Sequence, residues 1–398
     1  MKRTIIFIII LYLTQSIDSL SQDSNYQECI DSLYSEDYYS KLNAIECVNA
    51  LEIQDAVDIL VELIEIQQPY LQLQFLNTLY VLEYGDIQTI AHDLISRADR
   101  FDEDPEHPYD PLEAKVFATR ILVNKGDFST IEYVFDQLNG NEITIENITA
   151  FHLLPDVMAN MPNYKDEAKN ILLNELYNNS VDIRYYALTY LAEEFGEEMN
   201  DELRDKFIND NDLPTKIKAL EHLCINNYSE LNSLLKQQLE LEEEPSLRID
   251  IADSLLQKFG EPSDLKAVVD YQPNEPDETA RSLMAYSINN FIPPKLDTLN
   301  WSGLITKLIS YTEEMFQYDW IQNEETRDYY AQRLTEIYEA IENTSEIGEA
   351  CSIIDERILI QVEQDLQEQL ISTEGYKFLY YYTIYIKEEI EEEYGSCQ

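Results

Sequence analysis

The chain has 398 residues and carries 27 lysines and arginines against 78 aspartates and glutamates, a formal net charge of −51 at pH 7. This excess of negative charge argues against nucleic acids and anionic membranes as partners, because both are contacted mainly through lysine and arginine. Hydrophobic residues make up 44% of the sequence, so the chain is not a disordered acidic tail. Its 9 glycines are too few for many tight hairpins, which favours a helical protein.

Residues 1–21 have the pattern of a secretory signal peptide. Two basic residues precede an apolar run at 4–14 that is too short to cross a bilayer. Ser19 and Ser21 then provide a small-x-small cleavage site. The pattern predicts export to a periplasm or the cell exterior, or to the ER lumen and secretory route in a eukaryote. No later stretch has the composition of a membrane span, so no membrane insertion is expected after the signal is removed.

From residue 22 the apolar positions recur at helical spacing. A short helix is predicted at 25–33, and helix pairs follow at spacings of about 31 to 41 residues. Their first helices are expected to begin near residues 36, 70, 111, 144, 181, 214, 245 and 276. Pro155 lies inside the fourth of these and should break it.

The period is lost after about residue 294, where longer helices are predicted at 304–320, 324–343, 347–370 and 376–394. Terminal segments of a repeat stack must cover its last apolar face. The sequence therefore predicts a repeat domain at 22–295 and a C-terminal helical cap at 296–398.

The clearest repeat lies at 181–260 and has a period of 32 residues, so that Arg184 aligns with Lys216 and Arg248. Ile183, Ala187, Leu188, Leu191 and Phe195 share one helical face in the first copy. A shorter amphipathic segment follows each copy. One such helix hairpin cannot bury its apolar face alone, but stacking it on its neighbours does so. The pattern therefore predicts an α-solenoid.

The copies VDIRYYALTYLAEEFG and PSLRIDIADSLLQKFG resemble HEAT-like repeats. The middle copy departs from the pattern, with Lys216 in place of arginine and Tyr228 in place of glycine. The resemblance extends over about two-thirds of the chain and implies a curved, right-handed stack of antiparallel helix pairs. Such repeats serve many unrelated partners, so the resemblance implies the fold and leaves the function open.

The five cysteines suggest two disulfides near the ends of the array. Cys224 aligns with core positions of the repeat and is expected to be a buried, inert thiol. Cys351 begins one predicted long helix and Cys397 ends the next, so an antiparallel hairpin would bring them together. Cys29 and Cys47 could link the first two helices in the same way. An exported chain can keep such bonds, although sequence alone leaves the connectivity open.

An acidic insert at 99–111 interrupts the regular spacing. Positions 1, 3, 5, 9 and 12 of a twelve-residue window are occupied by Asp102, Asp104, Glu106, Asp110 and Glu113. This spacing resembles the ligand set of an EF-hand calcium loop. The sixth position, where that loop needs glycine, is His107, and three prolines stiffen the segment. The insert is therefore either a Ca²⁺ site or a solvated acidic loop.

No catalytic motif or cofactor fingerprint is found. No glycine-rich phosphate loop, nucleophile elbow or zinc spacing occurs, and the four histidines are well separated in sequence: His92, His107, His152 and His222. With 78 acidic residues, no carboxylate pair can be singled out as acid and base. The sequence therefore predicts a protein that is not an enzyme and has no resident cofactor.

Tyrosine is abundant, with 29 copies. Tyr185, Tyr186 and Tyr190 share one repeat helix, and 380–382 form a tyrosine run in the cap. Tyrosine is favoured at protein interfaces because it combines a large apolar area with a hydrogen-bonding tip. Ordinary helix packing explains such residues as well.

Together these features predict an exported, monomeric, non-enzymatic protein-interaction scaffold. Its acidic surface favours a basic or amphipathic protein partner, although a highly solvated surface would have the same charge. The alternative is a Ca²⁺-dependent binding protein that uses the insert at 102–113.

Overall fold

The computed structural model describes residues 22–103, 109–138, 143, 147–344 and 346–395. These residues are almost entirely helices and the turns between them. The one extended pairing within the described ranges is an isolated antiparallel bridge between Ile321 and Ile371. The predicted all-α solenoid architecture is confirmed. The proposed signal peptide at 1–21 lies outside the described residues.

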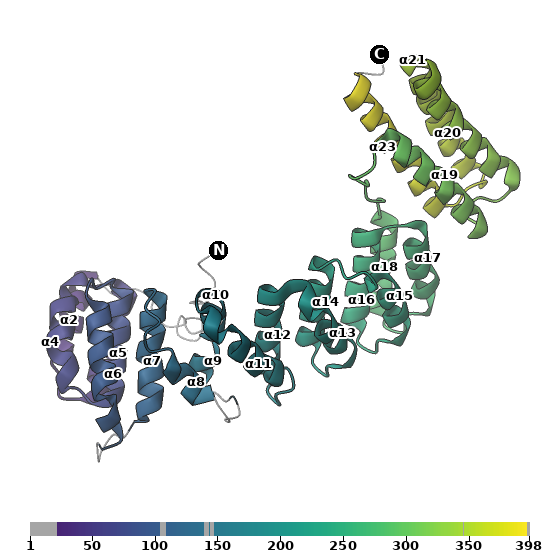
Figure 1. Ribbon diagram of the computed structural model, residues 1–398. Helices are drawn as coiled ribbons and strands as arrows, with labels where there is room; N and C mark the ends of the chain where they lie inside the picture. Colours follow the sequence, from purple (N-terminus) through teal and green to yellow (C-terminus); the bar gives the residue numbers. More distant parts are fainter. Residues whose placement is uncertain (1–21, 104–108, 139–142, 144–146, 345, 396–398) are drawn as a thin grey trace. The chain divides into compact units, whose positions relative to one another are not determined.

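The chain divides into two compact units, Met1–Glu194 and Phe195–Gln398. The predicted boundary at 295/296 stays a prediction. In unit 1 the helices follow one another in chain order (Figure 1), and α12 ends at the boundary: α2 (Gln22–Ser32), α3 (Tyr38–Leu51), α4 (Val57–Leu63), α5 (Pro69–Val81), α6 (Ile87–Arg97), α7 (Pro111–Asn124), α8 (Glu132–Leu138), α9 (Ile148–Phe151), α10 (Leu154–Asn160), α11 (Lys165–Glu175) and α12 (Val181–Phe195).

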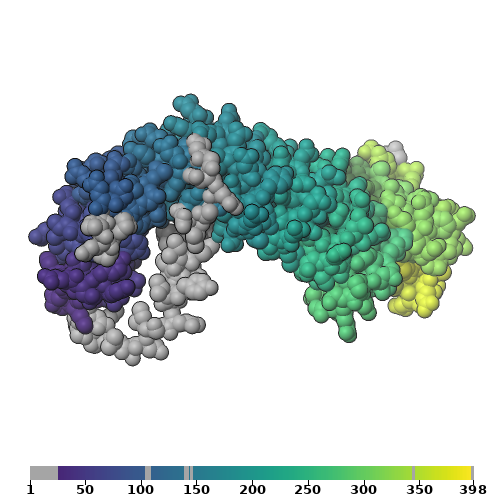
Figure 2. All heavy atoms as spheres, turned by 90° about the horizontal axis from the view of Figure 1, so that it is seen from below, coloured from purple at the N-terminus to yellow at the C-terminus, as the bar shows by residue number. Residues whose placement is uncertain are grey.

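Unit 2 contains shorter repeat helices followed by longer ones. Its repeat helices are α13 (Asn200–Asn209), α14 (Leu213–Ile225), α15 (Leu231–Leu241), α16 (Pro245–Ser254), α17 (Pro262–Tyr271) and α18 (Glu278–Asn290). The C-terminal helices are α19 (Trp301–Gln317), α20 (Glu324–Thr344), α21 (Ile347–Ser352), α22 (Ile360–Gln367) and α23 (Thr373–Tyr394). In Figure 2 the light green and yellow C-terminal segments lie together.

Prolines and capping residues set many helix starts. Pro69, Pro111 and Pro245 each occupy the first turn of a helix, where a missing N–H costs nothing. Pro155 lies in the first turn of α10, so it separates α10 from α9 as the sequence predicted. Helix ends are less regular: Asn227, not Tyr228, takes the left-handed conformation that Gly196 has in the preceding copy.

Three arginines at equivalent repeat positions tie their helices to the turns that precede them. Arg184 Nη1 donates to the carbonyl oxygens of residues 178 and 179, at 2.9 and 3.2 Å. Arg248 Nη1 makes the same pair of bonds to residues 242 and 243, at 2.9 and 2.7 Å. Arg281 repeats the pattern one copy later, with bonds to residues 275 and 276. The repeated arginine therefore satisfies carbonyl groups in the tight inter-repeat turn.

Lys216, which replaces arginine in the middle copy, makes a different bond. Its ammonium lies 2.8 Å from a carboxylate oxygen of Glu242, at the start of the next turn. Arg248 also forms a buried ion pair with Glu275, with its Nε 2.6 Å from a carboxylate oxygen. Adjacent repeats are thus joined by ion pairs that reach from a helix of one repeat to the turn before the next repeat.

The C-terminal helices pack around a buried aromatic core, with α23 in contact with α19. Phe378 and Tyr382 on α23 pack against Tyr311 on α19, with ring centroids 5.6 and 5.3 Å away. Lys377 donates to the carbonyl oxygens of residues 288 and 289, which anchors α23 to the end of the last repeat helix. These helices therefore cover the final repeat, as a cap must.

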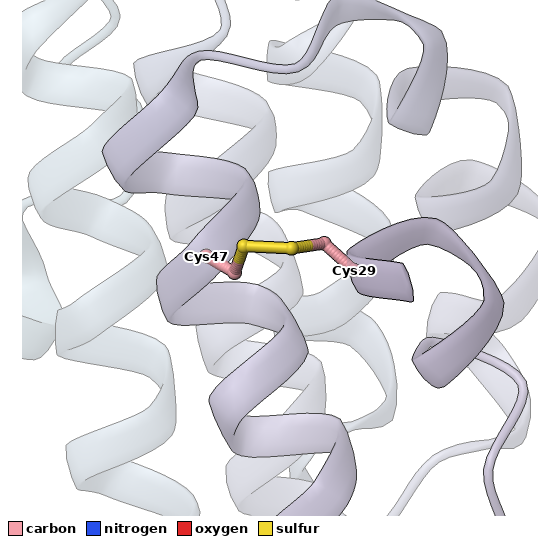
Figure 3. Close-up of a disulfide and its surroundings, with 2 residues drawn as sticks. All are labelled: Cys29 and Cys47. Atoms are coloured by element: carbon pink, nitrogen blue, oxygen red, sulfur yellow. A yellow bond between two sulfur atoms is a disulfide. The ribbon is translucent and has the colours of Figure 1, made fainter. Parts of the chain in front are cut away.

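A disulfide joins Cys29 on α2 to Cys47 on α3, with Cα atoms 6.0 Å apart (Figure 3). Cys351 is buried, and Cys397 lies outside the described residues, so the second pairing stays a prediction. Cys224 is half-buried rather than fully enclosed in the repeat core.

Candidate interaction surface

A cluster of aromatic rings lies in unit 1 where α9 and α12 meet. The ring of His152, which follows α9, stands edge-on to Tyr186 with centroids 5.0 Å apart. His152 Nδ1 is 2.7 Å from the hydroxyl oxygen of Tyr190. Tyr186 and Tyr190 lie one turn apart on α12, and their rings stack at 6.0 Å. The helical spacing of the tyrosines therefore places two rings beside one imidazole.

A buried phenylalanine packs against the core side of this cluster. Phe151 is fully buried and packs against the rings of His152 and Tyr190, at 5.6 and 5.8 Å. Tyr185 adds a further ring at 5.6 Å from Tyr186. Because Phe151 is fixed in the core, it restricts the positions that the partly exposed rings of His152 and Tyr190 can take.

Burial keeps the histidine–tyrosine pair uncharged. It lowers the pKa of His152 below its ordinary value, because a buried imidazolium loses its hydration. Burial also raises the pKa of the Tyr190 hydroxyl, and the carboxylates of Glu193 and Asp156 raise it further. At neutral pH the pair is therefore a neutral hydrogen bond.

Exposed carboxylates surround the rings. Burial raises the pKa of Tyr186 as well, and the negative charge of Asp182 adds to that shift. Asp156, Asp182 and Glu193 are all exposed. We call the set the aromatic–acidic surface; its members are His152, Tyr185, Tyr186, Tyr190, Asp156, Asp182 and Glu193.

Such a surface suits the side chain of a lysine or arginine. Aromatic faces attract cations through their quadrupole, and nearby carboxylates add a direct charge attraction. The apolar stem of lysine or arginine can lie along the rings while its charged end reaches the carboxylates. The arrangement therefore offers recognition of basic residues.

The sequence identified only part of this surface. The helical spacing of Tyr185, Tyr186 and Tyr190 was apparent in the sequence, whereas His152 was noted only as one of four histidines that are well separated in sequence. Its partner Tyr190 is 38 residues away in sequence. The one sequence signal for the position of His152 was Pro155, which predicted a helix break close to this histidine.

The acidic insert is described only in part. Asp104 and Glu106 lie outside the described residues. Asp110 caps α7, with one carboxylate oxygen accepting from the backbone N–H groups of residues 112 and 113. Glu113 accepts a hydrogen bond of 2.6 Å from the hydroxyl of Tyr109. Asp102 is exposed.

Two of these predicted ligands therefore have structural partners already. Among the residues that the structure describes, no group of three or more histidines, cysteines, aspartates or glutamates is placed to hold a metal ion. The Ca²⁺ site of the insert stays a prediction. In the same described ranges, no helix has the length and apolarity needed to span a bilayer.

Comparisons with protein-family models and with curated proteins each found no match. Among solved structures, a chain of the complex of CpcE and CpcF of phycocyanin lyase from Nostoc sp. PCC7120 is similar over 69% of this chain and 97% of that chain. The sequence identity is 17% and the TM-score is 0.32. At that TM-score the likeness assigns no activity, substrate or site to this chain. The HEAT-like family itself stays a prediction, whereas the helix-pair repeat is seen directly in the structure.

One expectation is corrected by this comparison. The sequence predicted a protein that is not an enzyme, because no catalytic motif and no distinct carboxylate pair could be found in it. The matched chain belongs to a lyase complex, so a helical-repeat chain can be part of an enzyme. The prediction of a non-enzymatic protein is therefore withdrawn.

Proposed function

We propose that this chain is an exported helical-repeat scaffold that binds a protein partner through lysine or arginine side chains. The observation that carries the proposal is the aromatic–acidic surface, where Tyr186 and Tyr190 stack beside His152 and exposed carboxylates surround them. This surface would make binding of the partner selective, because cation–π attraction depends on ring geometry as well as charge.

The net charge of −51 supports the same partner chemistry. A strongly negative protein attracts basic partners over long range and speeds their encounter, with an effect that salt weakens. The charge also disfavours nucleic acid as the ligand. We propose that the scaffold acts as a monomer.

Export forms part of the proposal and is supported by two features. The pattern at 1–21 is that of a signal peptide. The Cys29–Cys47 disulfide is a bond that persists in oxidising compartments and is rare in the cytosol.

The test uses the mature chain, residues 22–398, as bait on an extract of the exported fraction, with mass spectrometry as the readout. Three baits are compared: the wild type, Tyr186→Ala, and Tyr39→Ala as a matched control. Tyr39 is 72% exposed and lies in unit 1 on a different helix. The captured protein should be retained by the wild type and by Tyr39→Ala and depleted from Tyr186→Ala.

Binding of the captured partner is then measured directly by calorimetry. Tyr186→Ala should weaken it by roughly 3- to 30-fold, the range expected for loss of one cation–π contact. Asp182→Asn should weaken it less, and the loss should shrink at high salt. Equal loss in Tyr39→Ala, or a partner whose binding is unaffected by replacing its basic residues, would refute the proposed site.

A further inference from the structure

A second polar site lies in unit 1, away from the helices that carry the aromatic–acidic surface. An open pocket of about 460 Å³ forms where the start of α5 meets the end of α6 and the 3-10 helix Ala98–Glu103. The residues that line it include Gln67, Gln72, Arg97, Arg100, Phe101 and Glu103. Two arginines at one pocket stand out in a chain with so few basic residues.

The charge of Arg97 is poorly compensated. Arg97 ends α6, and its side chain is 22% exposed. Its Nη1 is 3.4 Å from a carboxylate oxygen of Glu65, whose side chain is 68% exposed. Its Nε and Nη2 are buried and have no acceptor among the described residues. A guanidinium offers five N–H donors in a planar fork, so most of this donor capacity is unused.

Arg100 adds a second positive charge at the same pocket. It is exposed and lies one turn beyond Arg97. Phe101 lines the pocket with an almost fully buried ring, only 5% exposed. An apolar wall next to two guanidinium groups lowers the local dielectric, which strengthens their attraction for an anion.

Gln72 supplies a second, independent observation at the same pocket. It lines the pocket and is only 5% exposed. Its Nε2 donates to the carbonyl oxygen of Gln67 at 2.8 Å, and this bond fixes which way the amide points. Its Oε1 is buried and receives no hydrogen bond from the described residues. Buried acceptors are nearly always satisfied, so this one needs a donor.

We propose that this pocket binds a carboxylate that carries an O–H or N–H donor beside it. The carboxylate pairs with Arg97 and Arg100, and the donor satisfies Gln72 Oε1. Two sources share this chemistry: a free 2-hydroxy acid, and the C-terminal end of a peptide, whose last N–H lies next to its carboxylate.

Calorimetric titration of the mature chain, residues 22–398, tests the pocket with four probes. These are L-lactate, acetate, acetyl-Ala-Ala with a free C-terminus, and the same dipeptide as its C-terminal amide. Saturable binding of lactate or of the free-acid dipeptide is expected, with acetate weaker because it lacks the donor. Lactate alone points to a free acid, and the dipeptide alone points to a chain terminus. Binding of the dipeptide amide as tight as that of the free acid overturns the proposal, as does binding of none of the four.

Variants then place the binding at this pocket. Arg97→Gln should weaken the best probe about tenfold or more, the usual loss for one charge-assisted hydrogen bond. Arg100→Gln should weaken it about fivefold, and this exposed site is safe for the fold. Gln72→Leu should remove the preference for lactate over acetate.

Arg204→Gln is the matched control, since it makes the same charge change at an exposed site in unit 2. Its affinity for the probes should equal that of the wild type. If Arg97→Gln does not fold, Arg100→Gln and Gln72→Leu decide the question. Equal weakening by Arg100→Gln and Arg204→Gln would show a general charge effect and overturn the assignment. Tyr186→Ala should leave probe binding unchanged, which separates this inference from the proposed function.

Discussion

Unit 2 holds its repeat helices and its C-terminal helices together in different ways. In the repeats α13–α18, charged side chains reach into the turns: Arg248 bonds to carbonyls five and six residues earlier and pairs with Glu275 in the next turn. In α19–α23, aromatic rings make the contacts, and they join residues far apart in sequence, as Tyr311 and Phe378 do.

This difference has a physical reason. Short helices expose many terminal carbonyl groups per residue, so a repeat stack needs a donor at every turn. Longer helices have fewer ends and larger faces, which bulky rings can fill. The repeats should therefore be sensitive to the loss of a polar partner, and the C-terminal helices to the loss of volume.

The largest effect is expected from Phe378→Ala. Phe378 is fully buried and packs against Phe291, Tyr311 and Trp320. Removing the ring should lower the free energy of unfolding by about 3–5 kcal/mol, through lost burial and the cavity left behind. Urea unfolding followed by tryptophan fluorescence measures it, because both tryptophans lie in this region.

Ile360→Ala is the control for that change, since Ile360 lies on α22 with its side chain 51% exposed. It should cost about 0.5 kcal/mol or less. A similar loss in both variants would mean that the aromatic core does not hold these helices together.

Arg248→Met probes the repeats and should cost about 3 kcal/mol, because it leaves Glu275 buried without its counter-charge. Far-UV circular dichroism during urea unfolding gives the value, with Arg204→Met as the exposed control. The double variant Arg248→Met/Glu275→Leu should recover part of the loss but not all, since the carbonyls of residues 242 and 243 still lack their donor. Full recovery would show that the carbonyl bonds contribute nothing.

Tyr330→Phe tests whether polar contacts also matter among the C-terminal helices. The buried hydroxyl of Tyr330 donates to Asp365 at 2.6 Å, and its loss should cost about 1–3 kcal/mol. Tyr329→Phe is the neighbour to compare, because its hydroxyl bonds an exposed backbone carbonyl at residue 357. That variant should cost about 0.5 kcal/mol. If the two variants have equal stability, the hydrogen bond from Tyr330 to the buried carboxylate of Asp365 does not stabilise the fold.

The smallest expected effect is a difference in pH dependence between two glutamates. Hydrogen bonds from Arg248 lower the pKa of Glu275, so its stabilisation is present above the unfolded value and is lost as the pH falls through the folded value. Burial raises the pKa of Glu314 on α19, so its ionised form opposes folding and stability should rise as it is protonated.

Melting temperatures between pH 3 and 7 distinguish the two. Glu275→Gln should lower the melting temperature at pH 7. It should also make the melting temperature decrease less steeply as the pH is lowered from about 5 to 3. Glu314→Gln should raise it slightly at pH 7. Shifts of the same sign in both variants at pH 7 would contradict this contrast.

The starts of several repeat helices could be predicted because their signals are local. Apolar spacing and first-turn prolines placed α7 and α16 at their observed first residues, Pro111 and Pro245. The alignment of Arg184 with Arg248 showed that the position repeats. It did not show what the guanidinium bonds to, because the accepting carbonyls are backbone groups that every residue has.

The candidate sites were harder to predict because they depend on contacts between distant segments. His152 meets Tyr190 only after the chain turns at Pro155. Arg97 and Gln72 line one pocket from two different helices, and neither belongs to a motif. Asp110 matched a ligand spacing, yet an aspartate before a proline is equally suited to cap a helix, as it does here.

The repeated arginine also bears on how such a stack could change length. Because each arginine bonds to carbonyls only five or six residues earlier, a copied segment of about 32 residues would bring its own anchor with it. Gene duplication could then add or remove whole repeats without leaving an unpaired turn. The pairs Lys216–Glu242 and Arg248–Glu275 are the exceptions, since each spans two copies and would be broken by a cut between them. Insertions and losses should therefore accumulate elsewhere in the array, which makes α14–α18 the segment least free to vary in number.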